Sequence, residues 1–288
     1  MSMLDEKYEK LKCFIEEKGK DGVVIAFSGG VDSSTLAAVC HKILRDKAVA
    51  VTAKSPVYPL EDLKDARKVA KEIGIKHYII ETNELLNEDF VRNPENRCYY
   101  CKKELIEHLQ KFAQKIGFKV VFEGTNFSDL RGHRPGFKAI EEKENVFSPW
   151  VEAGFTKEEI RLLAKKFGLS NYDKPAKACL ASRIPFGERI TEERLRRIGI
   201  AEKFIREICG VRQIRVRDHD GLARIEVGRE ERNRLFNLEI MDKIVEKLKQ
   251  LGFKYVTLDL EGYRSGSMLA TLRNNKRLID QAEKEFIQ

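Results

Sequence analysis

Apolar segments alternate with amphipathic segments through the first part of the chain. Runs rich in β-branched residues predict strands at 23–27, 48–53, 77–80 and 120–122. Helical periodicity predicts helices at 3–18, 32–43, 60–73, 102–116 and 155–167, the last opened by a capping box at Thr156 and Glu159. Strands that alternate with helices in this way predict an α/β domain, with one parallel sheet covered by helices on both faces.

Ligands of such sheets bind at the carboxyl ends of the strands. We therefore expect three strand exits to form one site, at residues 28–34, 53–55 and 123–126.

The pattern changes near Asn171, and we place a domain boundary there, with residues 1–175 in one domain and 176–288 in the other. The second part shows helical patterns at 191–208 and 237–251, and strand patterns at 213–217, 223–227 and 255–260. The turn at His219-Asp220-Gly221 predicts a hairpin between two of these strands. We expect a smaller α+β domain, followed by a terminal helix at 274–286.

Composition and charge indicate the cellular location and the kinds of partner to expect. The 288 residues carry 54 basic and 46 acidic side chains, a net charge of +8, and 42% of them are hydrophobic. No apolar run approaches the ~20 residues of a membrane span, and the first residues lack a hydrophobic signal segment. We expect a cytoplasmic protein without a membrane partner. The charge excess suits anionic small molecules and also permits a nucleic-acid partner.

The hexapeptide Ser28-Gly-Gly-Val-Asp-Ser33 follows the first predicted strand directly and leads into a helix. Two glycines let the backbone approach a ligand, and the N–H groups at a helix start attract anions. An ordinary glycine-rich turn with a serine cap is the alternative. The motif is not a Walker A loop, because no Gly-Lys-Ser/Thr follows the glycines. We predict a phosphate or pyrophosphate site here.

Three of the six cysteines, Cys98, Cys101 and Cys179, lie in polar loop-like sequence. A Cys-x-x-Cys pair in a reducing compartment has three interpretations: a redox pair, half of a zinc site, or two ligands of an iron–sulfur cluster. No thioredoxin-like unit and no fourth zinc ligand are evident, and three thiolates with one open position fit a cluster. The alternative is a stabilised loop with an incidental Cys179. The other three are expected to be inert on apolar helix faces: Cys13, Cys40 and Cys209.

The hexapeptide resembles the PP-loop of ATP pyrophosphatases, which implies an adenine nucleotide alpha hydrolase-like fold and cleavage of ATP between its α- and β-phosphates. Further motifs narrow the resemblance to the LarE family: Asn96–Lys102, Glu123–Asn126, Arg134–Gly136, Lys177–Arg183 and Asp259–Ser265. That family inserts sulfur into pyridinium-3,5-biscarboxylic acid mononucleotide during synthesis of a nickel-pincer cofactor. The resemblance implies that ATP adenylates a carboxylate and that a sulfur nucleophile then displaces AMP.

The same resemblance bears on the source of the sulfur. Members with only the cysteine that matches Cys179 give up its own sulfur, whereas members with the Cys-x-x-Cys pair look like cluster enzymes. The chain has all three positions, so the resemblance favours a 4Fe-4S cluster on Cys98, Cys101 and Cys179, reloaded by a sulfide donor. Sacrifice of Cys179 remains the alternative. The family also forms homo-oligomers, so we expect one here.

Site residues follow from the motifs. The ATP phosphates, with Mg²⁺ neutralising their charge, would be held by Ser28, Gly29, Gly30, Asp32, Ser33 and Ser34. The rest of the nucleotide pocket would comprise Ala53 and Lys54 beside the adenine, and Gly124, Thr125 and Asn126. Guanidinium groups suit phosphate and carboxylate, so the substrate candidates are Ser182, Arg183, Arg215 and Arg217. Arg215 and Arg217 alternate along a strand and share a face; Glu226 could pair with either, and a polar outer sheet face is the alternative.

Two other functions stay open. Some tRNA thiolases combine a PP-loop with a three-cysteine cluster, and the net charge fits them, although no zinc-ribbon cysteines or RNA-binding module are evident and nucleic acid is not the expected partner. A nucleotide-binding sensor that holds ATP without consuming it is the second, and the placed cysteines argue against it.

Overall fold

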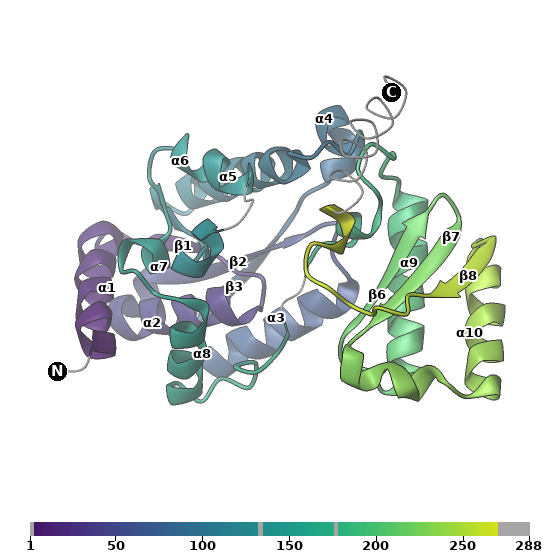
Figure 1. Cartoon of the computed structure of the whole chain (residues 1–288). Coiled ribbons are helices and arrows are strands. Elements are labelled where there is room, and N and C mark those ends of the chain that lie inside the picture. Colours follow the sequence, from purple (N-terminus) through teal and green to yellow (C-terminus); the bar gives the residue numbers. More distant parts are fainter. Residues whose placement is uncertain (1–2, 132–134, 176–177, 270–288) are drawn as a thin grey trace, which may run out of the picture. The chain divides into compact units, whose positions relative to one another are not determined.

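The computed structural model describes residues 3–131, 135–175 and 178–269, which fall into two compact units (Figure 1). The first unit comprises Met1–Phe90 and Asn96–Lys177, and the second comprises Val91–Glu95 and Ala178–Gln288. Arg134, Lys177 and the predicted helix at 274–286 lie outside the described residues.

The first unit contains a five-stranded parallel sheet with strand order β3-β2-β1-β4-β5. Its strands are β1 (Val23–Ala26), β2 (Ala48–Lys54), β3 (Lys76–Glu81), β4 (Val120–Phe122) and β5 (Val146–Phe147). The order reverses between β1 and β4, which is the switch point where open α/β sheets bind ligands. The predicted α/β fold is therefore confirmed, and the exits of β2, β1 and β4 are neighbours.

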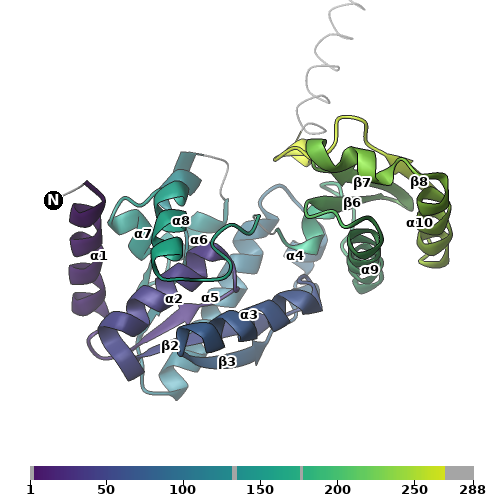
Figure 2. The ribbon, with the colours of Figure 1, turned by 90° about the horizontal axis from the view of Figure 1, so that it is seen from below.

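Helices cover both faces of this sheet (Figures 1 and 2). One face packs against α1 (Met3–Gly19), α2 (Val31–Leu44), α3 (Leu60–Ile73) and α8 (Lys157–Lys166). The other packs against α5 (Arg97–Lys115) and α6 (Pro135–Glu141). Because β1 is buried on both faces, its sequence is continuously apolar rather than alternating. Two short helices lie in connecting segments: α4 (Glu88–Val91), in which the chain passes from the first unit to the second, and α7 (Pro149–Glu152).

The first unit differs from the sequence prediction in several elements, including the short helices α4, α6 and α7, which were not predicted. Helix α5 begins at Arg97 and not at Lys102, so Cys98 and Cys101 lie in its first turns and not in a preceding loop. Asn96 precedes the helix, and its carbonyl accepts a hydrogen bond from the Tyr99 amide at 2.8 Å. Strand β5 was not predicted, because two residues carry no periodicity.

The second unit is a small α+β unit, as expected (Figure 2). Its sheet, ordered β6-β7-β8, consists of β6 (Ile214–His219), β7 (Leu222–Val227) and β8 (Tyr255–Leu258). Helices α9 (Glu192–Cys209) and α10 (Leu238–Gln250) pack with it. The predicted hairpin joins β6 and β7, and Asp220 and Gly221 at its turn both have positive φ, 47° and 92°. Positive φ at both central residues matches the twist of the paired strands.

Among the described helices, none combines the length and the apolar character needed to cross a membrane.

Candidate functional site

The loop 28–34 connects β1 to α2 at the switch point of the sheet. Gly29 has φ +72°, and a Cβ there would lie 2.8 Å from the Cα of Ala66 on α3. Gly30 is the N-cap of α2 and has an extended backbone without a side-chain cap. The loop thus needs glycine for conformation and for space, and it opens directly onto the amide groups of a helix start, which favour anions.

The serines of the loop hold its shape. The Ser33 hydroxyl donates to the Gly30 carbonyl at 3.1 Å and accepts from the Ser28 amide at 3.2 Å. The Ser28 hydroxyl lies 3.0 Å from that of Ser33 and accepts from the Gly30 amide at 3.3 Å. Ser33 and Ser34 are buried, whereas Ser28 is exposed. The loop is therefore preorganised by its own short side chains.

Asn171 braces the loop from a distant part of the first unit. Its side-chain amide donates to the Gly29 carbonyl at 2.9 Å and to the Ser34 hydroxyl at 3.0 Å. Asn171 is fully buried. Sequence reasoning missed this residue, because an asparagine in a loop-like segment gave no sign of a partner 142 positions away.

Asp32 lies in the first turn of α2 and pairs with Lys157 at the start of α8. The indole of Trp150 donates to the Asp32 carbonyl at 3.1 Å. Burial raises the pKa of the Asp32 carboxyl above its ordinary value, although the Lys157 ammonium opposes the shift. Lys157 was also missed: the capping box located the helix start, but not the long-range ion pair made by its first residue.

The exit of β4 is organised by Glu123, a buried carboxylate. It accepts hydrogen bonds from Lys102 at 2.9 Å, from the Thr125 amide at 3.0 Å and hydroxyl at 2.8 Å, and from Ser148. Burial alone would raise the pKa of the Glu123 carboxyl, but Lys102 and the hydroxyl donors outweigh it and leave that pKa lowered.

Gly124 and Asn126 follow Glu123 and reach the loop 28–34. A Cβ on Gly124 would lie 3.2 Å from the Ser33 amide nitrogen. The Asn126 side chain lies 3.5 Å from the Asp32 carboxylate. The structure therefore brings together two of the three predicted strand exits through these residues.

The end of β2 forms the third exit. Ala53 is half-buried there, and Lys54 is exposed and pairs with Glu81 on β3 at 2.8 Å. The Thr52 hydroxyl donates to the Phe27 carbonyl at 2.6 Å, which joins β2 to the residue before the loop.

Cys98 and Cys101 are three residues apart on α5, so their thiols share a face of the helix. Cys98 is exposed, Cys101 is half-buried, and none of the six cysteines forms a disulfide in the described structure. Cys13 is exposed on α1, so its expected place on an apolar helix face was wrong, whereas Cys40 and Cys209 are buried. Within the described ranges, no group of three or more His, Cys, Asp or Glu side chains could hold a metal ion.

In the second unit, Cys179 precedes a 3₁₀ turn, Leu180–Arg183, and its backbone is firmly held. The Cys179 carbonyl accepts from the Ser182 hydroxyl at 2.8 Å and from the Arg183 guanidinium at 2.9 Å. Arg183 is buried and forms a two-point ion pair with Glu202 at 2.8 and 3.0 Å. Glu202 was not predicted; it fixes the loop that presents the Cys179 thiol.

Arg215 and Arg217 lie on the same strand as predicted, but both are buried rather than on an outer sheet face. Arg217 pairs with Glu226 at 2.6 Å and donates to the Ser182 carbonyl at 3.0 Å. Arg215 lies over the Tyr263 ring at 5.1 Å. Burial and the neighbouring Arg183 lower the pKa of Arg215 to about 10.

Among the described residues of the second unit, the buried charged side chains are three arginines, Arg183, Arg215 and Arg217, and three carboxylates, Glu202, Asp218 and Glu226. In the described structure the Arg217 Nε is buried without a hydrogen-bond partner. A buried guanidinium with an unused N–H suits an anion. The four predicted substrate residues therefore gather around the Cys179 loop.

Known proteins resemble the chain over most of its length. It is 36% identical to a pyridinium-3,5-bisthiocarboxylic acid mononucleotide synthase of Lactiplantibacillus plantarum, over 87% of this chain and 90% of that protein. It is 44% identical to the uncharacterized protein slr1717 of a Synechocystis species, over 92% of this chain and 98% of that protein.

Two further matches cover only part of the chain. The NAD synthase family model matches residues 3–98, which include the loop 28–34. A tRNA-specific 2-thiouridylase of Rickettsia africae is 29% identical over 53% of this chain and 52% of its own length.

Proposed function

The chain belongs to the family of the pyridinium-3,5-bisthiocarboxylic acid mononucleotide synthases and is an ATP-dependent sulfurtransferase, and we propose that it converts the carboxylates of pyridinium-3,5-biscarboxylic acid mononucleotide into thiocarboxylates. The observation that carries the proposal is the 36% identity to such a synthase over 87% of the chain. The loop 28–34 supports it, since an amide-rich helix start next to Asp32 suits a nucleotide phosphate.

The first step is adenylation. A carboxylate oxygen of the substrate attacks the α-phosphorus of ATP, the bond from that phosphorus to the bridging oxygen breaks, and pyrophosphate leaves. Ser28, Gly29, Gly30, Ser33 and Ser34 would hold the phosphates. Asp32 would hold the Mg²⁺ that neutralises their charge, and Lys157, paired with Asp32 in the structure, would then turn its ammonium to the phosphates.

The remaining nucleotide contacts are assigned to the two neighbouring strand exits. Ala53 and Lys54 would flank the adenine, and Gly124, Thr125 and Asn126 would complete the pocket. The close approach of Gly124 to Ser33 supports this assignment, because a side chain at residue 124 would crowd the phosphate loop.

The second step transfers sulfur. A sulfur nucleophile attacks the carbonyl carbon of the adenylate, the carbon–oxygen bond to AMP breaks, and AMP leaves with the electron pair. Arg215 and Arg217 would bind the substrate's phosphate and carboxylates, supported by the burial of both guanidinium groups and by the Arg217 Nε, which has no hydrogen-bond partner in the described structure. Ser182 and Arg183 would act by fixing the Cys179 loop, since Arg183 is held by Glu202.

Cys98, Cys101 and Cys179 are the residues that would hold a 4Fe-4S cluster, which would supply sulfide as a deprotonated nucleophile. Cys98 and Cys101 lie on one helix face and form no disulfide, which supports this assignment, and Cys179 of the second unit would be the third ligand. Anaerobically prepared protein is expected to be brown with about four irons per chain. Cys98→Ala and Cys101→Ala should lose the colour, and its retention in both contradicts the assignment.

Turnover with ATP, the pyridinium diacid and sulfide tests the reaction itself. AMP, pyrophosphate and a product with oxygen replaced by sulfur are expected, whereas release of ADP contradicts adenylation. Mass spectrometry of the protein after turnover separates the sulfur sources. An intact Cys179 thiol supports the cluster, and loss of hydrogen sulfide from Cys179 means that its own sulfur is consumed.

Thiolation of tRNA is a second candidate, favoured by the match to a 2-thiouridylase over 53% of the chain. Phosphate contacts to tRNA make binding strongly salt-dependent. Co-purified tRNA whose binding falls steeply with salt would favour this activity, and its absence favours the small-molecule substrate.

A further inference from the structure

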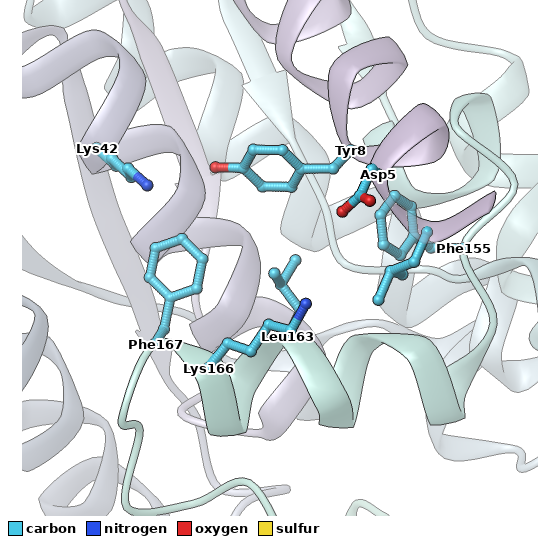
Figure 3. Close-up of a pocket in the computed structure, with 8 residues that line it drawn as sticks. Asp5, Tyr8, Lys42, Phe155, Leu163, Lys166 and Phe167 are labelled. Atoms are coloured by element: carbon cyan, nitrogen blue, oxygen red, sulfur yellow. The ribbon is translucent and has the colours of Figure 1, made fainter. Parts of the chain in front are cut away.

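A cavity in the first unit lies among α1, α2 and α8, and the proposed reaction does not use it (Figure 3). Its volume is about 270 Å³. Its apolar lining comprises Leu4, Tyr8, Phe155, Leu163 and Phe167. An apolar cavity of about 150 Å³ already holds benzene. The cavity is therefore large enough for a single ring that carries a small substituent.

The charged residues at the cavity favour an anion. Lys42 and Lys166 supply two ammonium groups against the one carboxylate of Asp5. Figure 3 shows the Lys42 ammonium directed toward the Tyr8 hydroxyl, and the Lys166 ammonium directed toward the space below the Tyr8 ring. Lys42 also lies 5.5 Å from the centroid of the Phe167 ring. Aromatic faces and two cations therefore border the same space.

We propose that this cavity is a binding site for a small aromatic carboxylate. Its ring would lie against Tyr8 and Phe167, which offer aromatic faces, and its carboxylate would meet Lys42, Lys166 and the Tyr8 hydroxyl. Such a ligand matches the lining in shape and charge, whereas an aromatic amine would bring a third positive charge to the two lysines.

The site is connected to the nucleotide loop through packed side chains. Phe155 lines the cavity, and its ring centroid lies 5.1 Å from that of Trp150. The Trp150 indole donates to the Asp32 carbonyl at 3.1 Å, and Lys157 follows Phe155 by two residues and pairs with Asp32. Occupation of the cavity is thus expected to change the affinity for ATP, and ATP to change the affinity for the carboxylate by the same factor.

Titration calorimetry on the full chain with benzoate tests the site. Benzamide is the matched probe, because it keeps the ring and the shape but has no charge. The double variant Lys42→Met, Lys166→Met should bind benzoate about tenfold more weakly than the wild type. Lys165→Met should bind like the wild type, because Lys165 is on the same helix as Lys166 but does not line the cavity and lies over Tyr172 instead.

Trp150, the single tryptophan of the chain, reports occupation by its fluorescence. Its emission should change with benzoate at the same midpoint as the calorimetry, and saturating ATP should shift that midpoint. Three results would overturn the proposal: no binding of benzoate, equal binding of benzamide, or undiminished binding by the double variant. An unchanged midpoint in ATP would overturn the connection to the loop. None of these readouts depends on sulfur transfer.

Discussion

The candidate anion sites of the two units are formed by different chemical groups. In the first, the loop 28–34 relies on backbone amides, glycines and short hydroxyl side chains, with Asp32 and Lys157 beside it. In the second, anion binding would rely on buried guanidinium groups that are stabilised by buried carboxylates such as Glu202. Amide dipoles need no counter-charge, whereas a buried cation without a partner is costly. The first design is therefore local, and the second depends on pairs assembled by folding.

Glu202→Gln should have the largest effect on stability, because it tests the dependence of the second unit on its buried ion pairs. The change leaves the buried Arg183 without its carboxylate, and removing one partner of a buried pair costs about 3–5 kcal/mol. Urea unfolding followed by hydrogen exchange should show the loss around residues 178–183. Glu207→Gln, on the exposed face of the same helix, serves as control and should change stability little. Equal stability of both variants would mean that the pair does not support the Cys179 loop.

Asp32→Asn should separate activity from stability in the first unit. Pyrophosphate release is expected to fall about 10²–10³-fold, the scale for removing a group that stabilises a transition-state charge. The raised pKa means that folding disfavours the ionised Asp32 carboxylate, so the neutral variant should unfold at the same or a higher urea concentration at pH 7. If Asp32→Asn lost stability along with activity, the ionised Asp32 carboxylate would serve the fold, which would contradict a purely functional role.

Gly29→Ala tests the claim that this loop needs glycine twice, for conformation and for space. Positive φ costs a non-glycine residue about 1–2 kcal/mol, and the contact with Ala66 should add to it. Gly168→Ala is the matched control, because its φ is +71° and no atom lies within 4 Å of the added Cβ. We expect the larger loss of stability, and loss of ATP binding, only in Gly29→Ala. Equal losses would show that space at the loop is irrelevant.

Glu123→Gln should have the smallest of these effects, a change in how folding stability depends on pH in the acidic range. Because the native pKa of Glu123 is lowered, the carboxylate stabilises the fold above its unfolded pKa, and this contribution disappears as pH falls through the native pKa. The stability difference from wild type should therefore shrink as the pH falls below 4.5, the ordinary pKa of a glutamate. The exposed Glu144→Gln should follow the wild-type profile at every pH. A difference that is constant with pH would contradict the linkage.

The sequence by itself determined the elements whose signals are local. Apolar β1, the glycine loop after it and the capping box at Thr156 each follow from neighbouring residues, and all three were predicted. The same holds for the hairpin, because positive φ at Asp220 and Gly221 is a property of the turn itself. The start of α5 was placed five residues late, because the polar segment around Cys98 and Cys101 resembles a loop until the helix behind it is formed.

Only the tertiary structure decided which distant groups serve these elements. Lys157 reaches Asp32 across 125 positions, and Asn171 reaches Gly29 across 142, so no periodicity or short motif connects them. Likewise, Arg215 and Arg217 have the alternation of an exposed strand face, and their burial depends on the carboxylates of Glu202 and Glu226 and on the packing of Tyr263. Local backbone geometry is determined by neighbouring residues in the sequence, whereas burial and charge pairing depend on contacts that exist only once the chain has folded.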